Sequence, residues 1–161
     1  MQRRQLIQAG AVMAFSASLS PAALAQARPR IEIWKDPNCG CCEEWVSHLK
    51  QNGFETQVHA NGNAAARQRL HVPEKLASCH TGQVAARGRA YAIEGHVPAR
   101  EIHRLLKERP KASGLVVPGM PIGSPGMDSA IYGERKDAYD VLLIQADGST
   151  SVYQRYHQAS T

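Results

Sequence analysis

Three of the four cysteines lie within four residues, in the motif Cys39-Gly40-Cys41-Cys42, and the fourth is Cys79. Cys39 and Cys42 have C-x-x-C spacing and follow Asp36-Pro37-Asn38, a sequence that ends a strand and can begin a helix. At a helix N-terminus the unpaired N–H groups and the helix dipole favour thiolate over thiol. A thiolate is both the nucleophile of disulfide exchange and a ligand for soft metals, so the motif predicts one of these two chemistries.

Metal binding is favoured by three features of the cysteines and methionines. Disulfide exchange needs two cysteines, and this motif has a third. The side chains of the neighbours Cys41 and Cys42 diverge, so they suit a cluster of several ions better than one tetrahedral ion. Met120 and Met127 offer thioethers in a loop stiffened by proline. Because thiolate and thioether are soft ligands, this set predicts Cu(I), with several ions per chain.

Two other chemistries stay open for the same cysteines. A zinc site built from cysteines normally has two separated C-x-x-C pairs, whereas Cys79 stands alone, so Zn(II) is the weaker prediction. A thiol-disulfide oxidoreductase would use the Cys39-Cys42 pair without a stable metal. No residue is assigned a catalytic role. If the protein is an enzyme, the motif favours an oxidoreductase.

Two histidines are further candidate ligands. His80 directly follows Cys79, at the junction between a short helix and a strand, although it can instead cap a turn or bond a backbone group. His96 follows the end of a predicted strand. If that strand is parallel to the first one, His96 lies at the same sheet edge as Cys39, where such folds place their sites. We therefore expect His96 to bind the metal or to support a ligand.

Several of these residues also have an ordinary structural interpretation. Cys79 can be a buried apolar residue, since free cysteine often is, and Met120 and Met127 can fill gaps in a core. His48 lies on the first predicted helix, three residues after Trp45, where we expect a surface or structural role. The remaining histidines show no ligand spacing and are interpreted as ordinary polar residues: His59, His71, His103 and His157.

The N-terminus has the features of a secretory signal peptide. Arg3 and Arg4 precede an apolar run over residues 9–19, and Ala23-Leu24-Ala25 forms a cleavage signal. The apolar run is too short to span a bilayer. The arginine pair also resembles a twin-arginine export signal. We expect residues 1–25 to be removed on export to the periplasm, which leaves one domain over residues 26–161.

Composition limits the partners of that domain. The chain has a net charge of +5, and cleavage would remove two arginines and no acids. The remaining bases are scattered, so we expect no nucleic-acid binding. No later apolar stretch reaches membrane-spanning length, so we expect no stable membrane insertion. Free thiols in the periplasm tend to be oxidised, so a metal or a redox partner must protect this cluster.

The elements that position these residues follow from periodicity and breakers. The pattern predicts strands over residues 31–34, 55–59, 89–94 and 115–117, helices over 41–51, 63–70 and 98–110, a short helical turn after Pro73, and a terminal hairpin over 141–155. Residues 118–127 contain too many prolines and glycines for regular structure. A cysteine motif between the first strand and the first helix is typical of thioredoxin-like proteins. The predicted fold is α/β, a single thioredoxin-like domain with a mixed sheet flanked by helices and a C-terminal β-hairpin.

Four stretches together resemble the CopG copper-resistance family, which belongs to a group of predicted periplasmic metal-binding proteins without an assigned function. They are Cys39-Gly40-Cys41-Cys42 with Trp45, Ser78-Cys79-His80-Thr81, Glu94-Gly95-His96-Val97-Pro98, and the loop from Val117 to Met127. The resemblance covers about residues 31–156 and implies a thioredoxin-like fold and a part in copper resistance. It implies a cysteine-bridged multinuclear copper site with Cys39, Cys41, Cys42 and Cys79 as ligands. The expected partners are copper ions and other periplasmic copper-handling proteins.

Overall fold

The computed structural model describes residues 28–158. The predicted signal peptide, residues 1–25, lies outside this range. Within it, no helix combines the length and the apolar character needed to cross a membrane.

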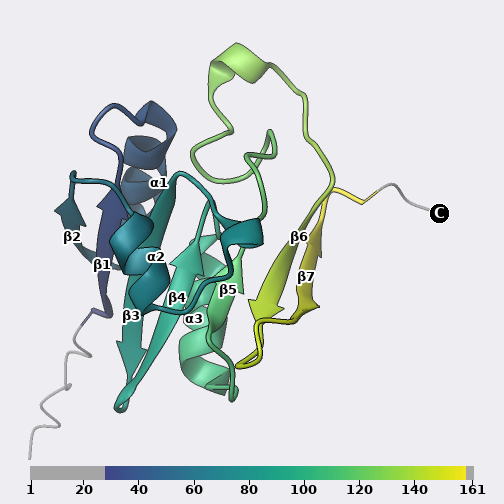
Figure 1. Cartoon of the computed structure of the whole chain (residues 1–161). Coiled ribbons are helices and arrows are strands. Elements are labelled where there is room, and N and C mark those ends of the chain that lie inside the picture. The colour runs from purple at the N-terminus through teal and green to yellow at the C-terminus, as the bar shows by residue number, and fades with distance from the viewer. Residues whose placement is uncertain (1–27, 159–161) are drawn as a thin grey trace, which may run out of the picture.

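Seven strands form one mixed sheet in the order β2-β1-β3-β4-β5-β6-β7 (Figure 1). β1 pairs with β2 in parallel and β4 pairs with β5 in parallel, whereas the other neighbours are antiparallel. The strands are β1 (Arg30–Lys35), β2 (Glu55–His59), β3 (His80–Ala86), β4 (Arg89–Glu94), β5 (Gly114–Val116), β6 (Tyr139–Ile144) and β7 (Thr150–Tyr156).

Helices cover both faces of this sheet. They are α1 (Gly40–Gln51), α2 (Ala64–Arg69) and α3 (Ala99–Glu108), with short 3₁₀ turns η1 (Glu74–Leu76) and η2 (Ala130–Tyr132). α1 and α3 lie on one face of the sheet, and α2 lies on the other (Figure 1). Successive strand residues point to opposite faces. Accordingly, Ile93 of β4 packs in the core shared with α1 and α3, whereas its neighbour Ala92 packs with Val72 and Leu76.

The predicted α/β class is confirmed, with a mixed sheet, flanking helices and a C-terminal hairpin. The thioredoxin-like assignment stays a prediction. One strand was missing from the sequence prediction, namely β3. It turns into β4 at Arg87 and Gly88, which have φ angles of 46° and 80°. Arginine is uncommon at positive φ, so this turn lacks the Asn-Gly or Asp-Gly signal of a hairpin.

β3 decides where the site can form. It is antiparallel to both β1 and β4. β1 and β4 therefore run in the same direction, and their carboxyl ends meet at one edge of the sheet. This is the condition under which we expected His96, just after β4, to lie at the same edge as Cys39, just after β1.

Candidate metal centre

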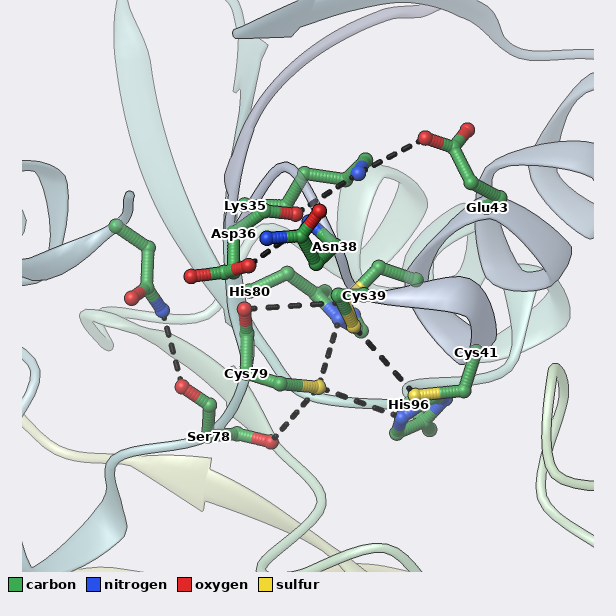
Figure 2. Close-up of a disulfide and its surroundings, with 12 residues drawn as sticks. Lys35, Asp36, Asn38, Cys39, Cys41, Glu43, Ser78, Cys79, His80 and His96 are labelled. Atoms are coloured by element: carbon green, nitrogen blue, oxygen red, sulfur yellow. Dashed lines mark hydrogen bonds and ion pairs between the residues drawn. A yellow bond between two sulfur atoms is a disulfide. The ribbon is translucent and has the colours of Figure 1, made fainter. Parts of the chain in front are cut away.

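All four cysteine sulfurs lie within 4.8 Å of one another. Cys39 precedes α1, Cys41 and Cys42 lie in its first turn, and Cys79 precedes β3. Cys39 and Cys42 are joined by a disulfide, whereas Cys41 and Cys79 are free thiols. The Cys41 sulfur lies 3.5 Å from that of Cys39 (Figure 2). The fold thus gathers every sulfur of the cysteines at the start of one helix.

The turn before α1 is built by Asp36. Its carboxylate accepts a hydrogen bond from the Asn38 N–H at 2.8 Å, and its carbonyl accepts one from the Cys39 N–H at 3.3 Å. Cys39 is the N-cap residue, and its side chain makes no capping hydrogen bond. The sulfur of Cys39 is therefore left for other chemistry at the positive end of the helix dipole.

A buried carboxylate holds the segment that carries Cys79. Glu94 accepts hydrogen bonds from the Ser78 N–H at 2.7 Å and from the Thr81 hydroxyl at 2.6 Å. The Asn63 amide donates to the Ser78 carbonyl at 3.0 Å. Burial raises the pKa of Glu94 to about 7, against the opposing effect of these hydrogen bonds. The network fixes the backbone on both sides of Cys79.

Two histidine rings present a nitrogen to the same sulfur. His80 Nδ1 lies 3.4 Å and His96 Nε2 lies 3.6 Å from Cys79 Sγ. The other nitrogen of each ring donates to a carbonyl at 2.8 Å, from His80 Nε2 to Gly95 and from His96 Nδ1 to Pro125. A carbonyl oxygen only accepts, so those nitrogens carry the protons. The free lone pairs therefore point toward Cys79, as in histidines that bind metals.

Burial keeps these histidines neutral. Burial lowers the pKa of His80 to about 3, and repulsion between the two rings when both are protonated adds to this effect; burial also lowers the pKa of His96. Burial and the neighbouring Cys41 raise the pKa of the Cys79 thiol to about 11. The metal-free site therefore holds neutral imidazoles around a protonated thiol. Neutral imidazole is the form that binds metal ions.

Trp45 of α1 orients the histidine pair from the core side. Its indole ring stacks on His80 with the ring centroids 4.2 Å apart, and its N–H donates to the Val97 carbonyl at 2.9 Å. The His80 and His96 rings meet edge to face at 4.9 Å. Because Trp45 is fully buried, it leaves His80 little freedom to turn away from Cys79.

The proline-glycine loop packs against the start of α1. Gly126 has a φ of 85°, and a Cβ at this position would lie 2.6 Å from the Cys41 carbonyl oxygen. Glycine is therefore required for the loop to approach the motif this closely. The next residue, Met127, is buried, and its sulfur lies 3.9 Å from the Tyr132 hydroxyl. Met120 is 54% exposed and lines a separate hollow beside β6.

Two solved structures match the chain over most of its length. They are named as Form 1 and Form 2 of copper resistance protein CopG. Each is 42% identical in sequence with a TM-score of 0.71, and the match covers 80% of this chain and 98% of theirs. The chain belongs to the CopG family. The family resemblance predicted from the sequence is confirmed.

Within this CopG-family chain, residues 76–127 match a family model described as "Protein of unknown function, DUF411". The matched segment includes Cys79, His80 and His96 and ends at Met127. No curated protein matches the chain. The family relationship and the cysteine cluster together indicate a metal-binding protein of copper resistance.

The predicted site residues fall into two groups in the structure. The fold brings together six of them: Cys39, Cys41, Cys42, Cys79, His80 and His96. Met127 contacts Tyr132 and Met120 lines the hollow beside β6, and neither of these contacts involves a cysteine sulfur. Whether any of the eight binds a metal stays a prediction.

Two functional candidates, Lys35 and Glu94, were not predicted from the sequence. Both are buried charged residues at the ends of strands beside the site. Lys35 carried a usable signal, because it occupies the inward-facing position that follows Ile31 and Ile33 in the alternation of β1. Glu94 carried none, since a single acid at a strand end is common on exposed edges.

Proposed function

We propose that this protein binds copper as Cu(I), with more than one ion per chain, and acts in copper resistance. The ligands we assign are Cys39, Cys41, Cys42 and Cys79, joined by His80 and His96. One observation supports this most strongly. Cys79 is shared between the group of four cysteine sulfurs and a second group formed with the two histidines.

A shared sulfur is suited to bridging. A thiolate can bind more than one soft ion, and the Cys79 sulfur lies close both to the other three cysteine sulfurs and to two imidazole nitrogens. The donor set of four sulfurs and two imidazoles matches the preference of Cu(I) for soft thiolate, with imidazole also acceptable. A single tetrahedral zinc ion would leave part of this set unused.

The disulfide implies that reduction comes before metal binding. A disulfide sulfur is not a thiolate, so Cys39 and Cys42 can serve as ligands only after their S–S bond is broken. A dithiol reductant supplies two electrons and two protons, becomes a disulfide itself and leaves two cysteine thiols. These thiols lose their protons when they bind copper.

A second function is favoured by the same disulfide. Cys39 and Cys42 form a C-x-x-C disulfide at the start of α1, the arrangement found in thiol-disulfide oxidoreductases. In such an enzyme these two cysteines would suffice, and Cys41→Ser would keep its activity on a disulfide substrate. In a copper site the same substitution removes a ligand.

One experiment separates the two functions. The reduced protein over residues 26–161 is titrated with Cu(I) and with Zn(II), metal content is measured, and X-ray absorption distinguishes sulfur from nitrogen ligands. We expect more than one Cu(I) per chain, mostly sulfur ligation, and little insulin reduction. One tightly held zinc that Cu(I) does not displace would refute the copper cluster. Full insulin reduction by Cys41→Ser without copper binding would support the oxidoreductase.

The cellular setting belongs to the same proposal. We propose that residues 1–25 direct export, by the general or the twin-arginine route, and that a thioredoxin-like domain over residues 26–161 acts in the periplasm. There it would exchange copper with other copper-handling proteins. Fractionation of cells that express the full chain, with mass determination of the mature N-terminus, tests the cleavage after Ala25.

A further inference from the structure

Lys35 is a positively charged side chain in the interior, beside the cysteine motif. It is 1% exposed and occupies the third inward-facing position of β1, after Ile31 and Ile33. Burying an ammonium group costs free energy unless charges and hydrogen bonds offset the loss of water. An apolar residue at this position would avoid that cost, so the contacts of Lys35 must offset it.

The ammonium group bridges the two ends of the motif. It donates to Glu43 Oε1 at 2.8 Å and to the Asp36 carbonyl at 2.9 Å (Figure 2). Asp36 precedes the motif and Glu43 follows it in the first turn of α1. The loop between these two contacts carries Cys39 and Cys41. Lys35 therefore holds both ends of the loop, and its positive charge lies at the base of the loop.

Lys35 also lies beside the histidine half of the site. It is the register partner of His80 across the β1–β3 pair, so the two side chains share one face of the sheet. Lys35 is thus joined both to the loop that carries Cys39 and Cys41 and to the strand that follows Cys79.

The charge of Lys35 is only partly cancelled. Its carboxylate partner, Glu43, is 60% exposed, so water screens that negative charge more than it screens the buried ammonium. The second partner, the Asp36 carbonyl, is neutral. A net positive charge therefore remains at the base of the loop that carries Cys39 and Cys41.

We propose that Lys35 is a positioning residue that supplies fixed positive charge to the cysteine site and stabilises thiolate and Cu(I) there. The assignment to Cu(I) rests on the proposed copper-binding function, whereas the effect on thiolates does not. A fixed positive charge favours the state of a site that carries less positive charge. It therefore favours thiolate over thiol, and Cu(I) over Cu(II).

The two partners of the ion pair provide the test. Lys35→Met removes the positive charge and keeps most of the volume, whereas Glu43→Gln removes the negative charge and leaves the ammonium unopposed. If Lys35 acts through its charge, the two substitutions have opposite effects. If the pair only holds the loop, both break the same contact and shift every property in the same direction.

The first measurement is the midpoint potential of the copper-loaded protein. We expect Lys35→Met to lower the Cu(II)/Cu(I) potential and Glu43→Gln to raise it by a smaller amount. The second measurement needs no metal. The reduced, metal-free protein is alkylated with iodoacetamide at pH 7, where thiolate displaces iodide as a carbon–sulfur bond forms. We expect alkylation to slow roughly threefold in Lys35→Met and to quicken in Glu43→Gln.

A third variant keeps the test independent of folding. Glu43→Lys changes an exposed side chain, and we expect it to raise both the potential and the alkylation rate more than Glu43→Gln does. Thermal melting identifies any variant that fails to fold. Shifts of both measurements in the same direction for Lys35→Met and Glu43→Gln would overturn the proposal, as would parent-like behaviour of Glu43→Lys. If the parent binds no copper but the alkylation rates diverge as stated, the copper function fails and the thiolate role of Lys35 stands.

Discussion

His96 Nε2 lies 3.6 Å from the sulfur of Cys79, although 17 residues separate them along the chain. Strands β3 and β4 form an antiparallel hairpin between the two residues. The chain leaves this edge of the sheet along β3 and comes back to it along β4, so that His96 lies at the edge where Cys79 lies. This relationship joins the cysteine group to a second, nitrogen-containing group and leads to the first two predictions.

Substitution of His96 is expected to weaken copper binding. His96→Gln removes the nitrogen that faces Cys79, and we expect the Cu(I) affinity to fall by at least about tenfold. Competition with a chromophoric Cu(I) chelator measures the change. His103→Gln is the matched control, because His103 lies on the exposed side of α3 and bonds the Asn52 carbonyl instead. Equal affinities for both variants would exclude His96 from the site.

Substitution of Cys79 is expected to weaken copper binding nearly as much as substitution of Cys39. Cys79 lies 37 residues beyond Cys42, yet its sulfur lies within 4.8 Å of the other three. We therefore expect Cys79→Ser and Cys39→Ser to lower both the Cu(I) stoichiometry and the affinity. The titration is carried out under reducing conditions, so that loss of the disulfide in Cys39→Ser does not confuse the comparison. Parent-like copper binding by Cys79→Ser would show that Cys79 is only a core residue.

Most of the fold could be predicted from local sequence patterns. Asp147-Gly148 marks the β6–β7 hairpin, and Pro98 marks the start of α3, as the structure confirms. β3 could not be predicted, because it begins with polar residues, contains Gly82 and ends in a turn that uses Arg87. The identity of a hairpin turn depends on φ angles, and arginine gives no indication of a positive φ.

The residues of the candidate site could be predicted from the sequence, but the hydrogen bonds that orient them could not. Cysteine spacing indicated the sulfur cluster, but the tautomers of His80 and His96 follow from carbonyl acceptors at Gly95 and Pro125. Those acceptors belong to loops whose backbone path depends on tertiary packing. The burial of Glu94 likewise follows from the tertiary packing of the Cys79 segment against β4, which no local pattern records.

The stability of the protein is expected to fall below about pH 6.5, and His48 contributes to this fall together with the buried His80 and His96. His48 Nε2 accepts a hydrogen bond from the Ala99 N–H at 3.1 Å, which joins the end of α1 to the start of α3. Burial lowers the pKa of His48 from its ordinary value of 6.5, against an opposing effect of Asp128. The unfolded chain therefore binds this proton more readily. The contribution of His48 is fully present above pH 6.5 and is lost as the pH falls through its folded pKa.

Urea unfolding at pH 7.5 and pH 5 measures this effect. Loss of the hydrogen bond corresponds to about 1 kcal/mol of unfolding free energy. His48→Gln should lower the stability at pH 7.5 and reduce the difference between the two pH values. His71→Gln serves as the control, since His71 is exposed. An unchanged pH dependence in His48→Gln would assign the acid sensitivity to other groups.

The last prediction concerns the two loop methionines, which stay candidate ligands. Met127 follows Gly126, where a Cβ would collide with the Cys41 carbonyl, and is 8% exposed, whereas Met120 is 54% exposed and borders β6. A thioether is a weak ligand, so it gains most from being held in place before the metal binds. Met127 is the better held of the two, because its loop is fixed both by Gly126 and by the Pro125 carbonyl that accepts from His96.

We therefore expect Met127→Leu to lower the Cu(I) affinity or shift the copper midpoint potential more than Met120→Leu does. Leucine conserves volume and removes only the sulfur, so the melting temperature of the metal-free protein should stay nearly unchanged in both variants. Chelator competition, voltammetry and thermal melting are measured on the same preparations. Because the thiolates supply most of the affinity, we expect a change of about threefold to tenfold for Met127→Leu. If the double variant matches the parent in affinity and potential, both methionines are packing residues, and the soft-ligand set consists of the four cysteines alone.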